Sequence, residues 1–499
     1  MSDFMNKHLT STIKKHKSLW IFCLVYLGIF FMKLDSIPMI AMDEGWNAFY
    51  AYDTFGSNPY DLSSTIQYQL FFLYYFFLSI WMKWFGISLI AVRSLAVVIG
   101  LVGLIGFYKC LSRLITHKGI VMFGMTLFTM TNIVVVTFRW GRPEGMVLVL
   151  LIWALYFLIK AIQLNSETQL IGVGLLMGLM VITHPYSGIM VIAFLGMAWR
   201  LPLKSIHAYR SFILGGGIIA FFILMKAVIW DLEYVKTYFI NHISERLILA
   251  NSEKSILENV SFFLESYTLG IKRLYIFLFE LGVLLLGITR YRKQSLISNL
   301  SWLGLLTLIA GLIFISPFRR RYMGIVMILS ILVGLLIGVH SQKKLKPILV
   351  AALIVYFLNN MAGNIVYVAN QRHNIAYSEI TTKLQAVIPN DATIIAPIQF
   401  WIALHPFYVV TDIHDQLKNN RGDNQLAYSD YIVTSPYFVR NVSPTTGGEA
   451  IGYNLSENVF HKSLNTAIQE KQWLKLLEFE AKPYDIIGVY EQSKKGERH

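Results

Sequence analysis

Residues 89–108 read LIAVRSLAVVIGLVGLIGFY, an apolar stretch with a single charged side chain, Arg93. An α-helix needs about 20 mostly apolar residues to cross the hydrocarbon core of a membrane. The stretch therefore predicts a membrane-spanning helix. Ten further apolar stretches predict spans in the same way, at residues 18–34, 119–137, 145–162, 169–183, 186–199, 211–230, 273–289, 296–315, 322–339 and 347–366.

The composition of the whole chain agrees with this prediction. Hydrophobic residues make up 55% of the 499 residues and charged residues only 14%, whereas soluble domains carry about 25% charged residues. The net charge of +14 comes from short basic clusters between apolar stretches, which is typical of cytoplasmic loops rather than of a nucleic-acid surface. The two cysteines, Cys23 and Cys110, imply no disulfide framework.

The basic clusters also predict the topology. The aromatic-rich stretch 66–85 is long enough to be mistaken for a span. If it stays on the outer side, the N-terminal arm 1–17 and five basic loops, which alternate along the chain, fall in the cytoplasm, as the positive-inside rule requires. We therefore interpret 66–85 as a helix in the outer membrane interface, where Tyr and Trp are enriched. The basic loops contain Lys109, Arg113, Lys118, Lys160, Arg200, Lys204, Arg210, Arg290, Arg292, Lys293, Lys343, Lys344 and Lys346.

The predicted fold class is an all-α polytopic membrane protein of about eleven transmembrane helices with a small α/β C-terminal extracytoplasmic domain. The transmembrane domain covers residues 18–366 and carries long external loops at 35–88 and 231–272. Residues 367–499 are more polar and contain predicted strands such as TIIAPI (393–398) and YDIIGVY (484–490). That length is enough for one small domain.

Three external charge groups are candidates for chemistry: Asp43–Glu44, the turn from Arg139 to Glu144, and the run Arg319, Arg320, Arg321 and Tyr322. Each also has a structural explanation. Loop carboxylates are often merely solvated, and Pro143 and Glu144 suit the start of a helix. Carboxylates near hydrocarbon are nevertheless costly and tend to mark function, and arginines held outside suit an anionic ligand such as phosphate.

These groups together suggest glycosyl transfer. A carboxylate can act as general base on an acceptor hydroxyl, and arginines can neutralise a leaving phosphate. A lipid-linked phosphosugar presents its phosphate at this depth of the membrane. Attack from the face opposite the phosphate would invert the anomeric centre.

At this point the chain resembles the GT-C glycosyltransferases, in particular their protein O-mannosyltransferase and aminoarabinose-transferase branch. The ordered features are Asp43–Glu44 after the first span, Phe85–Gly86 with Arg93 soon after, R-x-x-R-P-E at 139–144, and R-R-Y at 320–322. They cover about residues 20–340.

The resemblance implies a catalytic role for Asp43, with Glu144 as the acidic residue of the second external loop. Glu44 is the adjacent rival to Asp43. The resemblance also implies that the basic residues of the R-R-Y motif at 320–322 bind the donor phosphate. We assign the phosphate to Arg139, Arg142, Arg319, Arg320, Arg321 and Tyr322, with Arg93 and His184 as further candidates.

The sequence departs from the family at two places. Ile66–Leu70 replaces a His-Pro-Pro-Leu-Tyr-like entry to the interfacial helix, and His184–Pro185 stands where relatives often have Lys-Pro. Some GT-C enzymes bind a divalent ion between loop carboxylates and others do not, so a divalent metal stays an open alternative, and we assign no metal ligands and no other cofactor.

The predicted enzyme is a cell-envelope hexosyl- or pentosyltransferase in a bacterial inner or plasma membrane, with its active site facing the periplasm or exterior. Its partners are a polyprenyl-phosphate-linked sugar, a glycolipid, polysaccharide or protein acceptor, and the bilayer, without nucleic acid. Two alternatives stay open: a lipid or sugar transporter or flippase, and a non-catalytic assembly protein on the same fold. A transporter would favour polar residues at mid-membrane.

Overall fold

The computed structural model describes residues 17–40, 42–52, 72–184, 187–200, 209–219, 221, 271–314, 324–341, 345–405, 409–412, 429–435, 466 and 473–493. The chain forms two compact units. Unit 1 consists of Met1–Met32, Asp61–Tyr74 and Ala96–Val366, and unit 2 of Lys33–Tyr60, Tyr75–Leu95 and Tyr367–His499.

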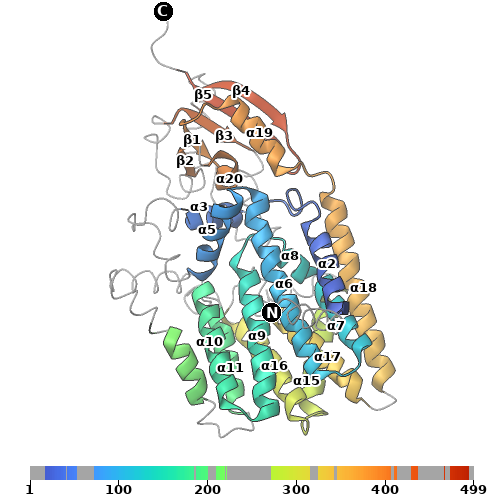
Figure 1. The fold of residues 1–499 in the computed structure, drawn as a ribbon. Coiled ribbons are helices and arrows are strands. Elements are labelled where there is room, and N and C mark those ends of the chain that lie inside the picture. The colour runs from blue at the N-terminus through green and yellow to red at the C-terminus, as the bar shows by residue number, and fades with distance from the viewer. Residues whose placement is uncertain are drawn as a thin grey trace, which may run out of the picture. The chain divides into compact units, whose positions relative to one another are not determined.

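Unit 1 is helical, and Figure 1 shows α9 and α10 side by side within it. Its helices are long runs of Leu, Ile, Val and Phe whose inward-facing residues are buried. They correspond to ten of the predicted spans, whereas half of the predicted span 211–230 lies outside the described residues. The helices are α2 (Lys17–Phe31), α6 (Leu89–Leu114), α7 (Lys118–Met130), α8 (Asn132–Thr137), α9 (Pro143–Leu164), α10 (Glu167–Thr183), α11 (Gly188–Ala198), α15 (Ile271–Thr289), α16 (Ser295–Phe314), α17 (Gly324–His340) and α18 (Leu345–Gln371).

Among the described residues, three helices are both long and apolar enough to cross a membrane unaided: α6, α9 and α18. Six shorter apolar helices accompany them. The mostly helical chain with a small C-terminal sheet agrees with the predicted fold class.

One predicted span, 119–137, consists of two helices. Helix α7 ends at Met130, Thr131 is extended with φ −65° and ψ 124°, and α8 begins at Asn132. The break releases backbone groups that α18 binds: the Asn132 N–H donates to Asn360 Oδ1 at 3.1 Å, and Asn364 Nδ2 donates to the Met130 carbonyl at 2.7 Å. Apolar periodicity could not reveal the break, because an apolar run, Ile133–Val136, follows it directly.

The aromatic stretch predicted to lie in the interface contains α5 (Leu73–Phe85). Thirteen helical residues rise only about 20 Å, which is short of the roughly 30 Å hydrocarbon core. Helices α7 and α11, which belong to predicted spans, are no longer than α5, so the position of this stretch in the interface stays a prediction.

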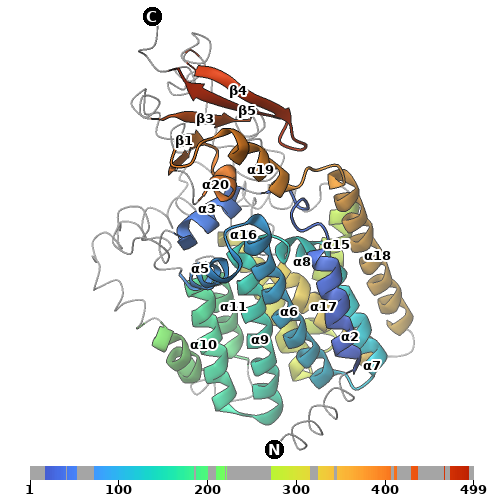
Figure 2. The same ribbon diagram turned by 45° about the horizontal axis from the view of Figure 1, so that its top comes forward.

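The C-terminal residues form a five-stranded sheet in the order β2-β1-β3-β5-β4. The strands are β1 (Thr393–Ala396), β2 (Val409–Asp412), β3 (Tyr431–Thr434), β4 (Trp473–Glu480) and β5 (Ile486–Gln492). Strand β1 pairs in parallel with β2 and β3, and β5 pairs antiparallel with β3 and β4. Helix α19 (Tyr377–Val387) lies beside this sheet, as Figure 2 shows. Both strands predicted from the sequence are confirmed.

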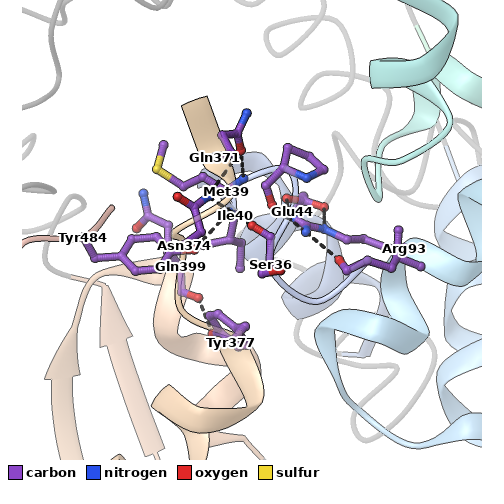
Figure 3. Close-up of polar contacts among 12 residues, drawn as sticks. Ser36, Met39, Ile40, Glu44, Arg93, Gln371, Asn374, Tyr377, Gln399 and Tyr484 are labelled. Carbon is purple, nitrogen blue, oxygen red and sulfur yellow. Dashed lines mark hydrogen bonds and ion pairs between the residues drawn. The ribbon is translucent and has the colours of Figure 1, made fainter. Parts of the chain in front are cut away.

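Unit 2 combines part of the predicted first external loop with the predicted C-terminal domain, and hydrogen bonds join these distant segments (Figure 3). The Ile40 N–H donates to the Tyr484 hydroxyl at 3.1 Å, and the Met39 N–H donates to Gln371 Oε1 at 2.9 Å. Asn374 donates to the Ser36 carbonyl. The loop before α3 (Met42–Tyr52) is thus held by residues more than 300 positions later in the chain.

Candidate active site

The predicted acidic pair lies in the first turn of α3, where negative charge is favoured by the helix dipole. Glu44, Ala48 and Ala51 lie on its buried face. Gly45 allows a close backbone approach, because a Cβ at this position would stand 2.2 Å from the Ile398 carbonyl oxygen. Small residues therefore seat α3 against the short helix η5 (Ile398–Phe400) and fix the direction of its first turn.

Glu44 forms a bidentate ion pair with Arg93, which comes from the first turns of α6. Arg93 Nε donates to Glu44 Oε1 and Nη2 to Oε2, both at 2.8 Å. Both side chains are completely buried. Figure 3 shows the guanidinium directed at the carboxylate. A buried charge needs such a partner, since isolated it would lose its hydration without compensation.

The remaining nitrogen of Arg93 binds the loop that leads into α3. Nη1 donates to the carbonyl oxygens of Leu34 at 2.8 Å and Pro38 at 2.6 Å. One planar guanidinium thus ties together the loop, the first turn of α3 and the start of α6. Arg93 was a further candidate site residue, and its side-chain nitrogens donate hydrogen bonds to Glu44, Leu34 and Pro38.

Asp43 differs from its neighbour in environment. It is half-buried, whereas Glu44 is fully buried. Adjacent residues on a helix point about 100° apart, so the two carboxylates face different surroundings. Asp43 is therefore the more exposed carboxylate of the pair.

The Arg139–Glu144 turn belongs to unit 1 and connects α8 to α9. Arg139 is 6% exposed and caps the C-terminus of α2. Its Nη1 donates to the carbonyls of Ile29 at 3.1 Å and Phe30 at 2.8 Å, and Nη2 to that of Met32 at 2.6 Å. The last carbonyls of a helix have no partner within the helix, and a cation there is favoured by the dipole.

Arg142 and Glu144 pair with one another in the same turn. Arg142 Nη2 lies 2.8 Å from Glu144 Oε1, and Nε donates to Oε2 at 3.2 Å. The Arg142 side chain is 17% exposed and Glu144 6%. Pro143 occupies the first turn of α9, as its fixed φ favours. The more accessible cation of this turn is Arg142.

The remaining predicted site residues lie away from these two ion pairs or outside the described residues. His184 follows α10, where its carbonyl accepts the Ser187 hydroxyl at 2.7 Å. The phosphate-binding run Arg319, Arg320, Arg321 and Tyr322 lies outside the described residues.

The structure thus brings Glu44 to Arg93 and Glu144 to Arg142, each pair within one unit. The sequence reading missed the Glu44–Arg93 contact, although a lone charge inside an apolar span is a signal for a buried partner. It also missed the aromatic residues of α3, which recur in the segment WNAFYAY.

The described residues do not fit a metal site. No group of three or more His, Cys, Asp or Glu side chains comes together among them, and Glu44 and Glu144 are each engaged by an arginine.

Comparison with known proteins gives a family match and a fold match. Residues 72–230 match the family model of dolichyl-phosphate-mannose-protein mannosyltransferase. The structure resembles ArnT from Cupriavidus metallidurans bound to undecaprenyl phosphate, with a TM-score of 0.56 and 11% identity over 96% of this chain and 99% of that chain. The apo form of the same protein gives a TM-score of 0.56 and 13% identity over 96% and 98%. No curated protein matches.

Proposed function

We propose that this chain, an integral membrane protein with the GT-C fold of ArnT and a segment of the protein-mannosyltransferase type, is a glycosyltransferase. It moves a sugar from a polyprenyl phosphate to an acceptor hydroxyl at the non-cytoplasmic face of a bacterial membrane, with inversion. The observation that carries the proposal is the first turn of α3, where a half-buried Asp43 adjoins a locked Glu44. Undecaprenyl phosphate bound to ArnT supports the lipid class of the donor.

The proposed step uses Asp43 as general base. Its carboxylate accepts the proton of the acceptor hydroxyl while that oxygen bonds to the anomeric carbon. The bond from the anomeric carbon to the phosphate oxygen breaks on the opposite face, and the polyprenyl phosphate leaves with the electron pair. General-base assistance of this kind contributes about 10²–10⁴ in rate.

Glu44 acts in this proposal as a positioning residue, although the sequence reading placed it among the catalytic candidates. Both its oxygens accept hydrogen bonds from Arg93. Taking a substrate proton would break a buried ion pair, which is costly. The pair instead fixes the turn that carries Asp43.

The donor phosphate is assigned to Arg142 and to the run 319–322. Arg142 has the exposed fraction and the fork geometry that suit a phosphate oxygen, and Glu144 holds its guanidinium in place. Arg139 ties the same turn to the C-terminus of α2 through its hydrogen bonds to the Phe30 and Met32 carbonyls. In this proposal Arg139 therefore helps to position Arg142.

Transfer from defined donors tests the proposal. Purified full-length protein is incubated with radiolabelled undecaprenyl-phosphate sugars and membrane glycolipid, polysaccharide or peptide acceptors. Wild type should release undecaprenyl phosphate and label an acceptor, and Asp43→Asn should lower this rate by about 10²–10⁴ with donor binding retained. Near-normal transfer by Asp43→Asn, or loss confined to Glu44→Gln, would remove Asp43 from the role.

A buried carboxyl within α15 favours the transporter alternative. Glu280 is 2% exposed, and the Tyr356 hydroxyl of α18 lies 3.5 Å from its Oε1. Ionisable residues inside spans often mark transport paths. Reconstituted protein that moves a fluorescent polyprenyl-phosphate sugar across vesicles without transferring its sugar would favour that function.

A further inference from the structure

Helix α3 carries aromatic rings on the same face as Asp43. Trp46 and Tyr50 follow Asp43 at three and seven residues, which places them on one side of an α-helix. Trp46, Tyr50 and Asp43 are all half-buried, whereas Ala48 and Ala51 on the other side are fully buried. The face that offers Asp43 to a substrate is therefore continued by two rings.

The two rings are stacked nearly parallel on one another and together form an aromatic wall of the helix. Their centroids are 5.2 Å apart and their planes differ by 14°. Phe49 meets Trp46 edge-on at 5.9 Å and Tyr50 edge-on at 5.1 Å. Asn47, between them in sequence, is buried and accepts a hydrogen bond from the Tyr75 hydroxyl of α5 at 3.2 Å. The wall is thus fixed on one side by α5.

Residues of the C-terminal segment pack against the aromatic residues of α3. Trp401, which is 3% exposed, meets Phe49 at 5.7 Å, and His405 stacks on Trp401 at 4.3 Å. The His405 ring also meets Tyr52 at 4.0 Å. Nδ1 of His405 is buried and has no hydrogen-bond partner among the described residues. Aromatic packing through unit 2 therefore holds the rings in a defined orientation.

The exposed fraction of these rings distinguishes them from lipid-facing anchors. Trp84 and Trp199 are 73% and 74% exposed, as expected for tryptophans in a membrane interface. Trp46 and Tyr50 are half-buried and packed against other rings. This combination is typical of a ligand site, where aromatic walls accompany a few placed polar groups.

We propose that Trp46 and Tyr50 form a stacking surface for a saccharide acceptor, so that the class of acceptor is a glycan and not a protein side chain. The inference rests on the proposed transfer at Asp43. A sugar ring has an apolar C–H face that lies flat on an aromatic ring and a rim of hydroxyls. One such hydroxyl reaches Asp43, about 4.5 Å back along the helix axis from Trp46.

Binding without turnover tests the surface. Full-length Asp43→Asn protein in detergent is applied to an array of immobilised oligosaccharides and to an array of Ser- and Thr-containing peptides. Saccharide binding is expected, and adding Trp46→Ala or Tyr50→Ala should weaken it at least tenfold, whereas Trp46→Phe retains most of it. Trp199→Ala is the matched control and should leave binding unchanged.

Each outcome decides the proposal. Binding to peptides only, no binding to either array, or saccharide binding equal in parent and Trp46→Ala would overturn it. If Trp46→Ala does not fold, as judged by thermal unfolding, Tyr50→Ala and Trp46→Phe carry the comparison. Release of undecaprenyl phosphate by wild type is measured separately. Saccharide binding without any release would keep the surface and reject the proposed transferase, and transfer to peptide alone would do the reverse.

Discussion

At the scale of single residues, the Glu44–Arg93 pair explains why two adjacent carboxylates have different roles. Arg93→Ala would leave the Glu44 carboxylate buried without its partner, and would also free the Leu34 and Pro38 carbonyls. Removing one partner of a buried pair costs about 3–5 kcal/mol. We expect the thermal unfolding midpoint of Arg93→Ala to fall strongly, and Arg93→Lys to restore little, because an ammonium lacks the planar fork.

The control for this prediction is Arg113, an exposed arginine near the other end of α6. Arg113→Ala should change the midpoint little. The double variant Glu44→Leu with Arg93→Met should lose less stability than the sum of its single variants, since neither charge is left alone. Strict additivity would argue that the pair is not coupled.

His405 predicts a pH dependence. Burial lowers its pKa from 6.5 to about 4, so between these values the unfolded chain binds a proton that the folded chain does not. Stability of unit 2 should therefore fall as pH decreases from 6.5 to 4 and stay constant above 6.5. After screening of the partly exposed ring this amounts to about 1–2 kcal/mol.

The measurement compares thermal unfolding of wild type and His405→Gln at pH 7.5, 6 and 5. The neutral amide cannot take up the proton, so the variant should lose less stability on acidification. Parallel pH curves for the two proteins would contradict the assignment.

At the scale of elements, the break between α7 and α8 depends on α18. Asn360→Leu and Asn364→Leu each leave a backbone group of the break without its partner. Unmade buried hydrogen bonds of this kind cost about 1–2 kcal/mol each. We expect a lower unfolding midpoint for each variant and a smaller change for Asn359→Leu, whose hydrogen bond to the Lys272 carbonyl is exposed. Equal decreases of the unfolding midpoint at all three positions would mean that these two hydrogen bonds do not stabilise the break.

Local signals in the sequence determined most of these elements. Apolar runs of helical length predicted the ten described spans to within about six residues at each end, and the segments TIIAPI and YDIIGVY were predicted as the strands that became β1 and β5. The sequence did not predict the helix break at Thr131, because the break depends on side chains more than 200 positions away in the chain.

The roles of the charged residues could not be predicted either, because their partners are also distant in the sequence. The sequence identified Glu44, Arg93 and Arg139 as notable, but only the fold shows that two of them pair and that the third caps α2. A residue's type signals that it needs a partner, whereas the identity of the partner depends on tertiary structure.

At the scale of the whole molecule, the side of the membrane on which each loop lies follows from the charges. The tight connection Arg290–Gln294 between α15 and α16 is basic, and so is the end of α6 at Arg113. The positive-inside rule assigns both to the cytoplasm, provided that α5 does not span. We therefore expect a reporter fused after residue 293 to be cytoplasmic and one fused after residue 400 to be external.

Cysteine labelling tests the same topology in the intact chain and isolates the contribution of α5. Cys23 and Cys110 are both buried, so a Cys23→Ala, Cys110→Ala background gives a silent parent. His117→Cys, in the exposed link between α6 and α7, should resist a membrane-impermeant maleimide in intact cells and react after permeabilisation. Ser378→Cys, at the exposed start of α19, should react without permeabilisation. Because α5 is the one ambiguous stretch before residue 117, the reverse pattern at His117→Cys would mean that it spans. Two spans, α5 and α6, would then separate Asp43 from His117, so Asp43 would lie on the same side of the membrane as the basic loops. The proposed site would lose its topological basis.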